Sequence, residues 1–140
     1  MNIKNKILII LIFLLPSNLF ANTDNFGQGL IFFEKKEFEK AKFKFEQDLV
    51  MNPKSEKSYL YLSKIFNFQK KKDLEEQNLN TVILLNPKNE EATFNLAKLK
   101  LEKSDFQESK LLIEKLIVFC KNYCQKSKTL IIEIENSSKK

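Results

Sequence analysis

The two cysteines, Cys120 and Cys124, are the residues whose type and spacing most directly suggest chemistry. In an oxidising compartment, two cysteines without a third favour a disulfide. If Asn122 breaks the helix between them, the sulfurs can meet, whereas a continuous helix would strain a bridge from position i to i+4. The alternatives are two free, packed thiols, or a redox or metal role. The last is disfavoured, because the spacing is not C-x-x-C and no histidine completes a zinc site.

Little else in the sequence points to catalysis. The chain has no histidine, so the commonest general base and the usual partner of a catalytic serine or cysteine are missing. Its two glycines, Gly27 and Gly29, are too few for a phosphate-binding loop. The paired glutamates at positions 75–76 and 90–91 are expected to be solvated surface groups. We therefore predict a protein that is not an enzyme, with no catalytic residue, no cofactor and no metal.

The composition favours a helical fold. A length of 140 residues suits one domain, and 43% hydrophobic with 30% charged residues is typical of a folded soluble protein. Two glycines and three prolines are too few for a turn-rich sheet protein. The net charge of +6 comes from lysine alone, and the lysines are interspersed with acidic residues. Nucleic-acid binders gather basic residues into a patch, so no nucleic-acid partner is expected. The arginine-free composition suits a bacterium with an AT-rich genome.

The first residues have the layout of a secretory signal peptide. Lys4 and Lys6 form a basic start, residues 7–15 are an unbroken apolar run, and Ala21 suits cleavage. The run is shorter than the ~20 residues that a spanning helix needs. We therefore expect a signal peptide at residues 1–21 and export to the periplasm. The alternative is an uncleaved anchor, the only case in which a membrane association is expected.

Two similar segments recur in the remainder of the chain. LVMNPKSEKSYLYLSKIF at residues 49–66 is echoed by ILLNPKNEEATFNLAKLK at residues 83–100, and the prolines Pro53 and Pro87 are 87 − 53 = 34 positions apart. Each unit holds two amphipathic runs whose apolar residues recur at helical spacing. The units lie at about residues 22–55, 56–89 and 90–123.

This pattern resembles tetratricopeptide repeats, which are pairs of antiparallel helices with a period of 34 residues. The family has a small residue late in the first helix, where the two helices cross closely, and Gly29, Ser63 and Ala97 occupy that place. It has an aromatic residue at the start of the second helix, and Phe38 and Phe106 occupy that place. Small side chains let helix backbones approach, while large ones fill the space between neighbouring helices.

The resemblance implies an all-α fold. We expect three helix-turn-helix repeats that stack into an α-solenoid, preceded by the helix of the signal peptide. The repeat domain would span residues 22–136 and end in a capping helix at about 123–136, with a polar tail at 137–140, giving seven helices after the signal. The second repeat departs from the pattern, with Lys72 at the aromatic place and Glu75 at a small-residue place. Its turn is therefore expected to be a residue or two longer.

The family's geometry implies that the first helices line a concave face, where a peptide or helix can bind. The residues that the resemblance places on this face are Phe26, Leu30, Phe33, Leu60, Tyr61, Lys64, Asn67, Phe68, Phe94, Asn95, Lys98 and Leu101. Aromatic side chains would supply contact area there, while asparagine and lysine would orient the guest. The alternative for Phe26, Phe33 and Phe94 is simple packing between adjacent repeats.

These observations predict a non-catalytic adaptor or scaffold in the cell envelope, which binds a protein or peptide partner on the concave face. Two alternatives stay open. One is a thiol-redox protein that uses Cys120 and Cys124. The other is a structural module that holds an oligomer together. The sequence specifies neither the partner's identity nor the oligomeric state.

Overall fold

A computed structural model describes residues 24–139, and the predicted signal peptide at 1–21 lies outside the described residues. The described chain is entirely helical and contains no strand. The prediction of an all-α fold with seven helices in this region is confirmed. The helices are α2 (Asn25–Glu34), α3 (Phe38–Met51), α4 (Glu56–Phe68), α5 (Lys72–Leu85), α6 (Glu90–Glu102), α7 (Phe106–Phe119) and α8 (Cys124–Ser137).

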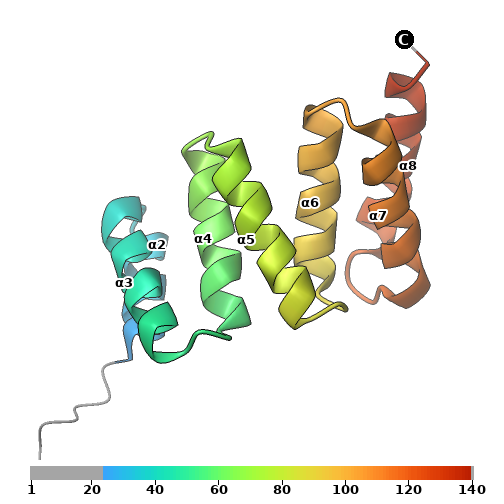
Figure 1. Cartoon of the computed structure of the whole chain (residues 1–140). Coiled ribbons are helices and arrows are strands. Elements are labelled where there is room, and N and C mark those ends of the chain that lie inside the picture. Colours follow the sequence, from blue (N-terminus) through green and yellow to red (C-terminus); the bar gives the residue numbers. More distant parts are fainter. Residues whose placement is uncertain (1–23, 140) are drawn as a thin grey trace, which may run out of the picture.

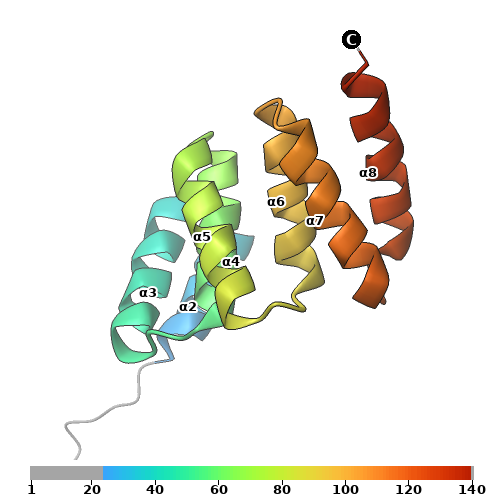
Figure 2. The ribbon, with the colours of Figure 1, turned by 45° about the vertical axis from the view of Figure 1, so that its right-hand side comes forward.

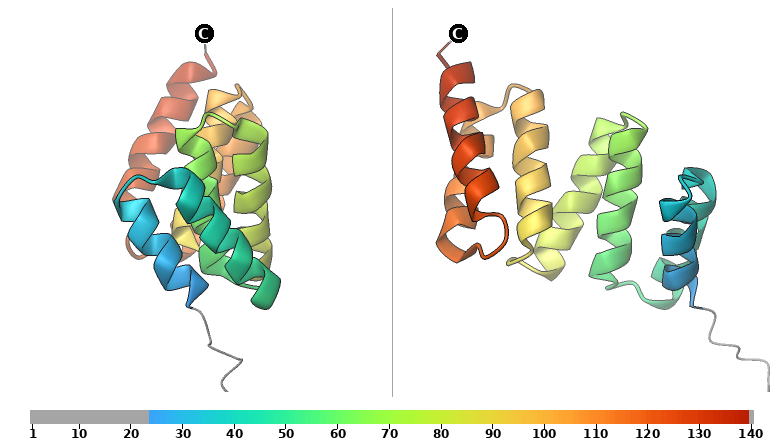
Figure 3. Two further views of the ribbon diagram at one scale, coloured as in Figure 1. Left: turned by 90° about the vertical axis from the view of Figure 1, so that its left-hand side faces the viewer. Right: turned by 180° about the vertical axis from the view of Figure 1, so that it is seen from behind.

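The helices form three antiparallel pairs that stack side by side, with α8 at the end of the stack (Figures 1 and 2). Within each pair α2 packs on α3, α4 on α5, and α6 on α7, and each pair also packs on the next through α3 with α4 and α5 with α6. Seen from behind, α2, α4, α6 and α8 form the near layer, with α3, α5 and α7 behind them (Figure 3, right). The first helices of the repeats therefore share one face of the molecule.

The three turns inside the repeats are built alike. Each contains one residue with a left-handed backbone, Lys36 at φ 60°, Lys70 at φ 56° and Ser104 at φ 60°, and these positions are 34 residues apart. In each turn the N–H of the following residue donates to a carbonyl five positions earlier, at 2.9 Å, which closes the helix in the Schellman manner. The prediction of a longer turn in the second repeat is therefore wrong.

A polar pair occupies the place at the start of α5 where the first repeat has an aromatic stack. In the first repeat, Phe38 at the start of α3 stacks on Phe68 at the end of α4, with ring centroids 4.8 Å apart. The equivalent residues one repeat later are Lys72 and Glu102, whose charged groups form an ion pair at 3.2 Å. A salt bridge thus occupies the place that the aromatic stack has in the first repeat.

The core is divided into two buried clusters. One joins the first repeat to α4 and includes Ala41, Phe45 and Ile65, while the other extends from α4 to α8 and includes Leu79 and Ile113. Residues 45, 79 and 113 are equivalent positions of the three repeats, and all three side chains are fully buried. The repeat period therefore determines which side chains form the interior.

The close crossing of the first two helices depends on Gly29. A Cβ atom at this position would lie 2.5 Å from Cε1 of Phe45, which is well inside van der Waals contact. Ser63 and Ala97 hold the equivalent places in the later repeats, and both are buried. The small-residue positions that the sequence indicates do lie inside the packed helix pairs.

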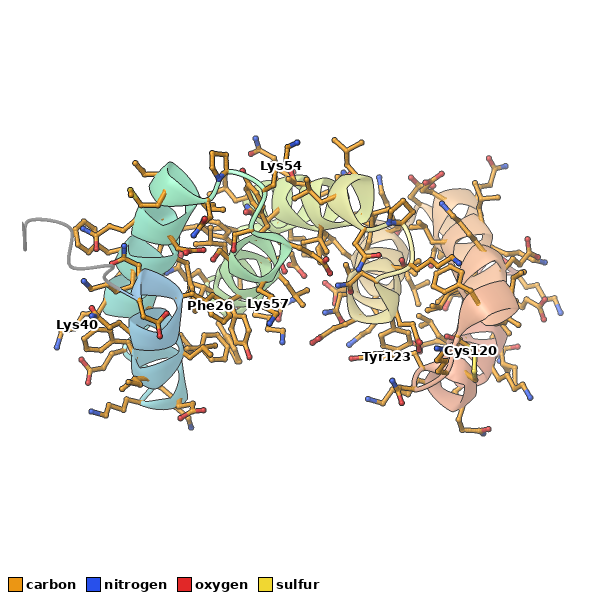
Figure 4. All side chains as sticks on the ribbon, turned by 90° about the horizontal axis from the view of Figure 1, so that it is seen from below. Phe26, Lys40, Lys54, Lys57, Cys120 and Tyr123 are labelled. Atoms are coloured by element: carbon orange, nitrogen blue, oxygen red, sulfur yellow. A yellow bond between two sulfur atoms is a disulfide. The ribbon has the colours of Figure 1, made fainter. Side chains whose placement is uncertain are left out.

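A sharp corner joins α7 to α8. The carboxylate of Glu90 accepts hydrogen bonds from the backbone N–H groups of Lys121, Asn122 and Tyr123, at 2.8–2.9 Å, which holds the chain out of the helix between 120 and 123. Cys120 and Cys124 flank this corner and form a disulfide, with Cα atoms 5.4 Å apart (Figure 4). The break in the helix is what brings the two sulfurs together.

Candidate functional site

A pocket of about 370 Å³ lies between the first helices of successive repeats. We call it the groove pocket. Residues from α2, α4 and α6 make up its wall, with a single contribution from a second helix, α5. Its lining residues are Phe33, Ser63, Lys64, Asn67, Phe68, Glu75, Glu91, Asn95, Lys98, Leu99 and Glu102.

Half of the concave-face residues that the sequence singles out line this pocket. These are Phe33, Lys64, Asn67, Phe68, Asn95 and Lys98. Two others, Phe94 and Leu101, line two separate openings near α6 and α8, and Lys98 lines both of them. The structure therefore brings together residues from all three predicted repeats on one side of the molecule.

The remaining aromatic residues of the predicted set pack between helix pairs. The ring of Tyr61 meets Phe26 at 5.8 Å and Phe33 at 5.1 Å, both edge to face. At the other end, Phe94 contacts Tyr123 with centroids 5.3 Å apart. Figure 4 shows Phe26 next to Lys57, whose ammonium lies 6.0 Å from the ring centroid. Phe26, Phe33 and Phe94 thus follow the packing alternative, although Phe33 also lines the groove pocket.

Two leucines of the predicted set do not reach the pocket. Leu60 is buried in the larger core cluster with Leu79 and Val82, because its side of α4 faces α5 rather than the open face. Leu30 is partly buried against the smaller cluster that contains Phe45. Leu60 therefore belongs to the core, in contrast to its predicted place on the concave face.

Ion pairs join the elements around the groove pocket. Nζ of Lys64 on α4 lies 2.8 Å from Oε1 of Glu91 on α6, and the same ammonium lies 4.5 Å from the centroid of the Tyr61 ring. The ion pair between Lys72 and Glu102 links α5 to α6 on another side. Glu91 and Glu102 are thus neutralised by lysines of this chain.

Glu75 is the one charged side chain of the pocket that is almost fully buried, at 5% exposure. Both of its carboxylate oxygens accept from Nδ2 of Asn67, at 3.0 and 3.2 Å. Burial raises the pKa of Glu75 above its usual value, and the hydrogen bond from Asn67 opposes that rise without cancelling it. The pocket therefore contains a desolvated carboxylate.

The expectation that the paired glutamates are solvated surface groups is wrong for Glu75, which is buried, while Glu76, Glu90 and Glu91 are partly exposed and bonded to other groups of the chain. Glu76 lies 2.7 Å from the ammonium groups of both Lys100 and Lys103, which hold its pKa below the usual value. Glu90 anchors the corner before α8, and Glu91 pairs with Lys64. Adjacent carboxylates in the sequence thus perform separate structural tasks.

The importance of Glu75 could have been found from the repeat period. It is equivalent to Ala41 and Ser109, which are fully buried where the two helices of a repeat cross. The hydroxyl of Ser109 donates to the carbonyl of Ala97 at 2.7 Å, so this position faces the first helix. A carboxylate at such a position must be buried, whatever its charged neighbours in the sequence suggest.

The structure is similar to solved tetratricopeptide-repeat domains. The first such domain of Spaghetti, bound to an HSP90 peptide, has a TM-score of 0.75 at 14% identity, covering 83% of this chain and 91% of that chain. The Yersinia enterocolitica type III secretion translocator chaperone SycD has a TM-score of 0.74 at 14% identity, covering 83% and 84%. The Sgt2 domain from Aspergillus fumigatus reaches 0.70 at 16% identity, covering 83% and 80%. The chain has a tetratricopeptide-repeat fold.

Sequence comparison adds no closer relationship. No protein-family model matches the chain, and no curated protein matches it significantly. Within residues 24–139, none of the helices is long and apolar enough to span a bilayer. The same part of the chain contains no cluster of three or more cysteine or acidic side chains that could hold a metal ion.

Proposed function

We propose that this protein is a non-catalytic adaptor of the cell envelope, which holds a peptide or helix of a partner protein in the groove pocket. The observation that carries the proposal is the composition of that pocket. Two phenylalanine rings, Phe33 and Phe68, lie beside amide and charged groups on a face shared by all three repeats. Apolar area with a few convergent polar groups is the usual make-up of a binding site.

Phe68 is the strongest single argument for a guest. Its side chain is 61% exposed, although its ring stacks on Phe38, and it lines the groove pocket. Covering an exposed aromatic ring with a partner removes apolar area from water, which stabilises the complex. The proteins of similar fold include a domain bound to an HSP90 peptide and a translocator chaperone, which fits a role in protein interaction.

The envelope location rests on the predicted signal peptide at residues 1–21 and is consistent with the disulfide between Cys120 and Cys124. Expression of the full-length chain in a bacterium, followed by fractionation and amino-terminal sequencing, tests it. We expect a periplasmic product that begins at Asn22. A product that stays in the cytoplasm with Met1 intact would contradict the location.

The binding role is tested with protein purified from cells that express the full-length chain. A phage library of random linear peptides is selected on wild type, and enriched sequences are measured as labelled synthetic peptides. Phe68→Asp should weaken binding at least about tenfold, because it puts a charge into the apolar contact. Phe43→Asp is the matched control, since Phe43 on α3 is 56% exposed and does not line the groove pocket.

The two variants separate a groove from a sticky surface. Equal binding by wild type, Phe68→Asp and Phe43→Asp would refute the groove pocket as the site. Failure of the wild type to enrich any sequence would refute the peptide-binding role itself.

A further inference from the structure

The residue that least fits the repeat pattern is Glu75. Ala41 and Ser109 fill the equivalent place in the other repeats with small side chains. A buried carboxylate there costs free energy unless it is well hydrogen-bonded or paired with a cation. The groups that surround Glu75 therefore decide whether it is a purely structural residue.

The other buried carboxylate of the described chain, Asp48, is well satisfied. It accepts hydrogen bonds from the Ser58 hydroxyl and from Nδ2 of Asn52 at 3.0 Å. Burial alone would raise the pKa of Asp48, but these and neighbouring donors bring it below the usual value. Asp48 is thus satisfied by its own chain and has no need of a ligand.

Glu75 is satisfied much less completely. A single amide group, that of Asn67, serves both of its oxygens, although an ionised carboxylate has about four acceptor sites. Lys72 and Lys98 lower its pKa through space, yet within residues 24–139 no ammonium lies within the 4.0 Å of an ion pair with Glu75. The carboxylate thus keeps free acceptor sites and faces a pocket.

The surroundings of the pocket fit a cation with an apolar stem. Phe33 and Phe68 line the same pocket as Glu75, so they can cover the aliphatic part of an arginine or lysine side chain. Glu91 and Glu102 also line the wall and are already paired with Lys64 and Lys72. The carboxylate left for a guest is Glu75.

We propose that the groove pocket takes a basic side chain of the partner protein, whose cationic group pairs with the carboxylate of Glu75 while its stem packs on Phe33 and Phe68. This inference rests on the proposed binding role of the groove pocket and specifies the chemistry of its guest. Arginine should bind better than lysine, because a planar guanidinium can reach both oxygens of one carboxylate and stack on an aromatic ring.

Other guests fit this pocket poorly. An acidic side chain placed against Glu75 would meet a carboxylate that no lysine within residues 24–139 pairs with, whereas Glu91 and Glu102 are paired with Lys64 and Lys72. A purely apolar guest would cover Glu75 and remove its remaining contact with water without offering a hydrogen bond, which costs free energy. Charge complementarity at one buried group therefore selects the guest.

The test compares wild type with Glu75→Gln, using peptides selected from the same random library. Gln preserves the shape and can still accept from Asn67, so the variant should fold, which circular dichroism checks. We expect arginine- or lysine-containing sequences on wild type, and at least about tenfold weaker binding of those peptides by Glu75→Gln. Glu114→Gln is the charge-matched control, because Glu114 on α7 is exposed and lies outside the groove pocket.

Two further measurements sharpen the result. Replacing the arginine of a selected peptide by norleucine should abolish the difference between wild type and Glu75→Gln. Lys98→Met should tighten binding of the basic peptide several-fold, because it removes the competing cation of the pocket wall.

Each outcome has a definite meaning. The role of Glu75 is overturned if acidic or purely apolar sequences are enriched, or if wild type and Glu75→Gln bind basic peptides equally. In either case the groove pocket remains the binding site if Phe68→Asp still weakens binding. An equal loss in Glu114→Gln would overturn the role of Glu75 too, since the effect would then come from net charge. If wild type enriches no peptide sequence, both the role of Glu75 and the binding role of the groove pocket are overturned.

Discussion

Substitution of Gly29 by alanine is the sharpest test of the helix crossing in the first repeat. The new Cβ would lie 2.5 Å from Cε1 and 2.7 Å from Cδ1 of Phe45, about 1 Å inside normal carbon contact. The Phe45 ring is fully buried between Phe26 and Tyr61, with centroids at 5.7 and 5.3 Å, so it has little room to move. Overpacking of this kind costs about 1–3 kcal/mol, while the better helix propensity of alanine returns about 1 kcal/mol.

The expected net destabilisation of Gly29→Ala is therefore about 1 kcal/mol, a fall in Tm of about 4–8 °C for a domain of this size. Urea unfolding followed by circular dichroism at 222 nm measures it. Phe45→Leu should cost roughly 1 kcal/mol alone through lost packing. Combined with Gly29→Ala it should restore part of the loss, because the third repeat pairs Ala97 with the smaller Ile113 at the same two positions.

The double-mutant cycle can refute this reasoning. We expect a favourable coupling of about 1 kcal/mol between the two substitutions. If their effects add to within about 0.3 kcal/mol, or if Gly29→Ala alone raises the urea midpoint, then Gly29 and Phe45 are not in close contact at the crossing of α2 and α3.

Three further predictions follow from the turns, the buried carboxylate and the disulfide. Lys70→Gly should raise the free energy of unfolding by about 0.5–1 kcal/mol, because glycine adopts φ 56° without strain; a lower urea midpoint would contradict this. Because burial raises the pKa of Glu75, the folded state favours the protonated form of this carboxyl group. Wild type should therefore lose stability relative to Glu75→Gln as the pH rises from 4.5 through that raised pKa. A difference in Tm between the two proteins that stays constant from pH 4 to 8 would contradict this. Reduction of Cys120–Cys124 should cost at most about 2 kcal/mol, because the bridge closes a very short loop, and should leave peptide binding intact; loss of binding in dithiothreitol would instead favour a thiol-dependent role.

Much of the fold could be predicted because the sequence repeats its steric requirements every 34 residues. Gly29, Ser63 and Ala97 indicate the helix crossings, and the structure places them inside the packed pairs. The register of α5 could not be read from its first residue, because Lys72 replaces the aromatic anchor. Lys72 instead forms an ion pair with Glu102, a partner that is 30 residues away in the sequence.

The site could be predicted only in outline. The period indicates which side of each first helix faces outward, but not how much of that side the next repeat covers. Phe26 and Tyr61 therefore pack against each other between neighbouring helix pairs, while Phe68 remains exposed. Charge patterns near Glu75 suggested a solvated surface, because a polar sequence neighbourhood does not reveal the burial that the helix crossing imposes.

The stacked arrangement also has a mechanical consequence. Each helix packs mainly on the helices next to it along the chain, so the molecule is a stack of units with an interface between each pair of neighbours. Small rotations at the α3–α4 and α5–α6 interfaces would add up along the stack. They would change the distance between Phe33 and Asn95, while the core within each helix pair stays packed. A solenoid of this kind can therefore change its curvature while the packing inside each helix pair is preserved.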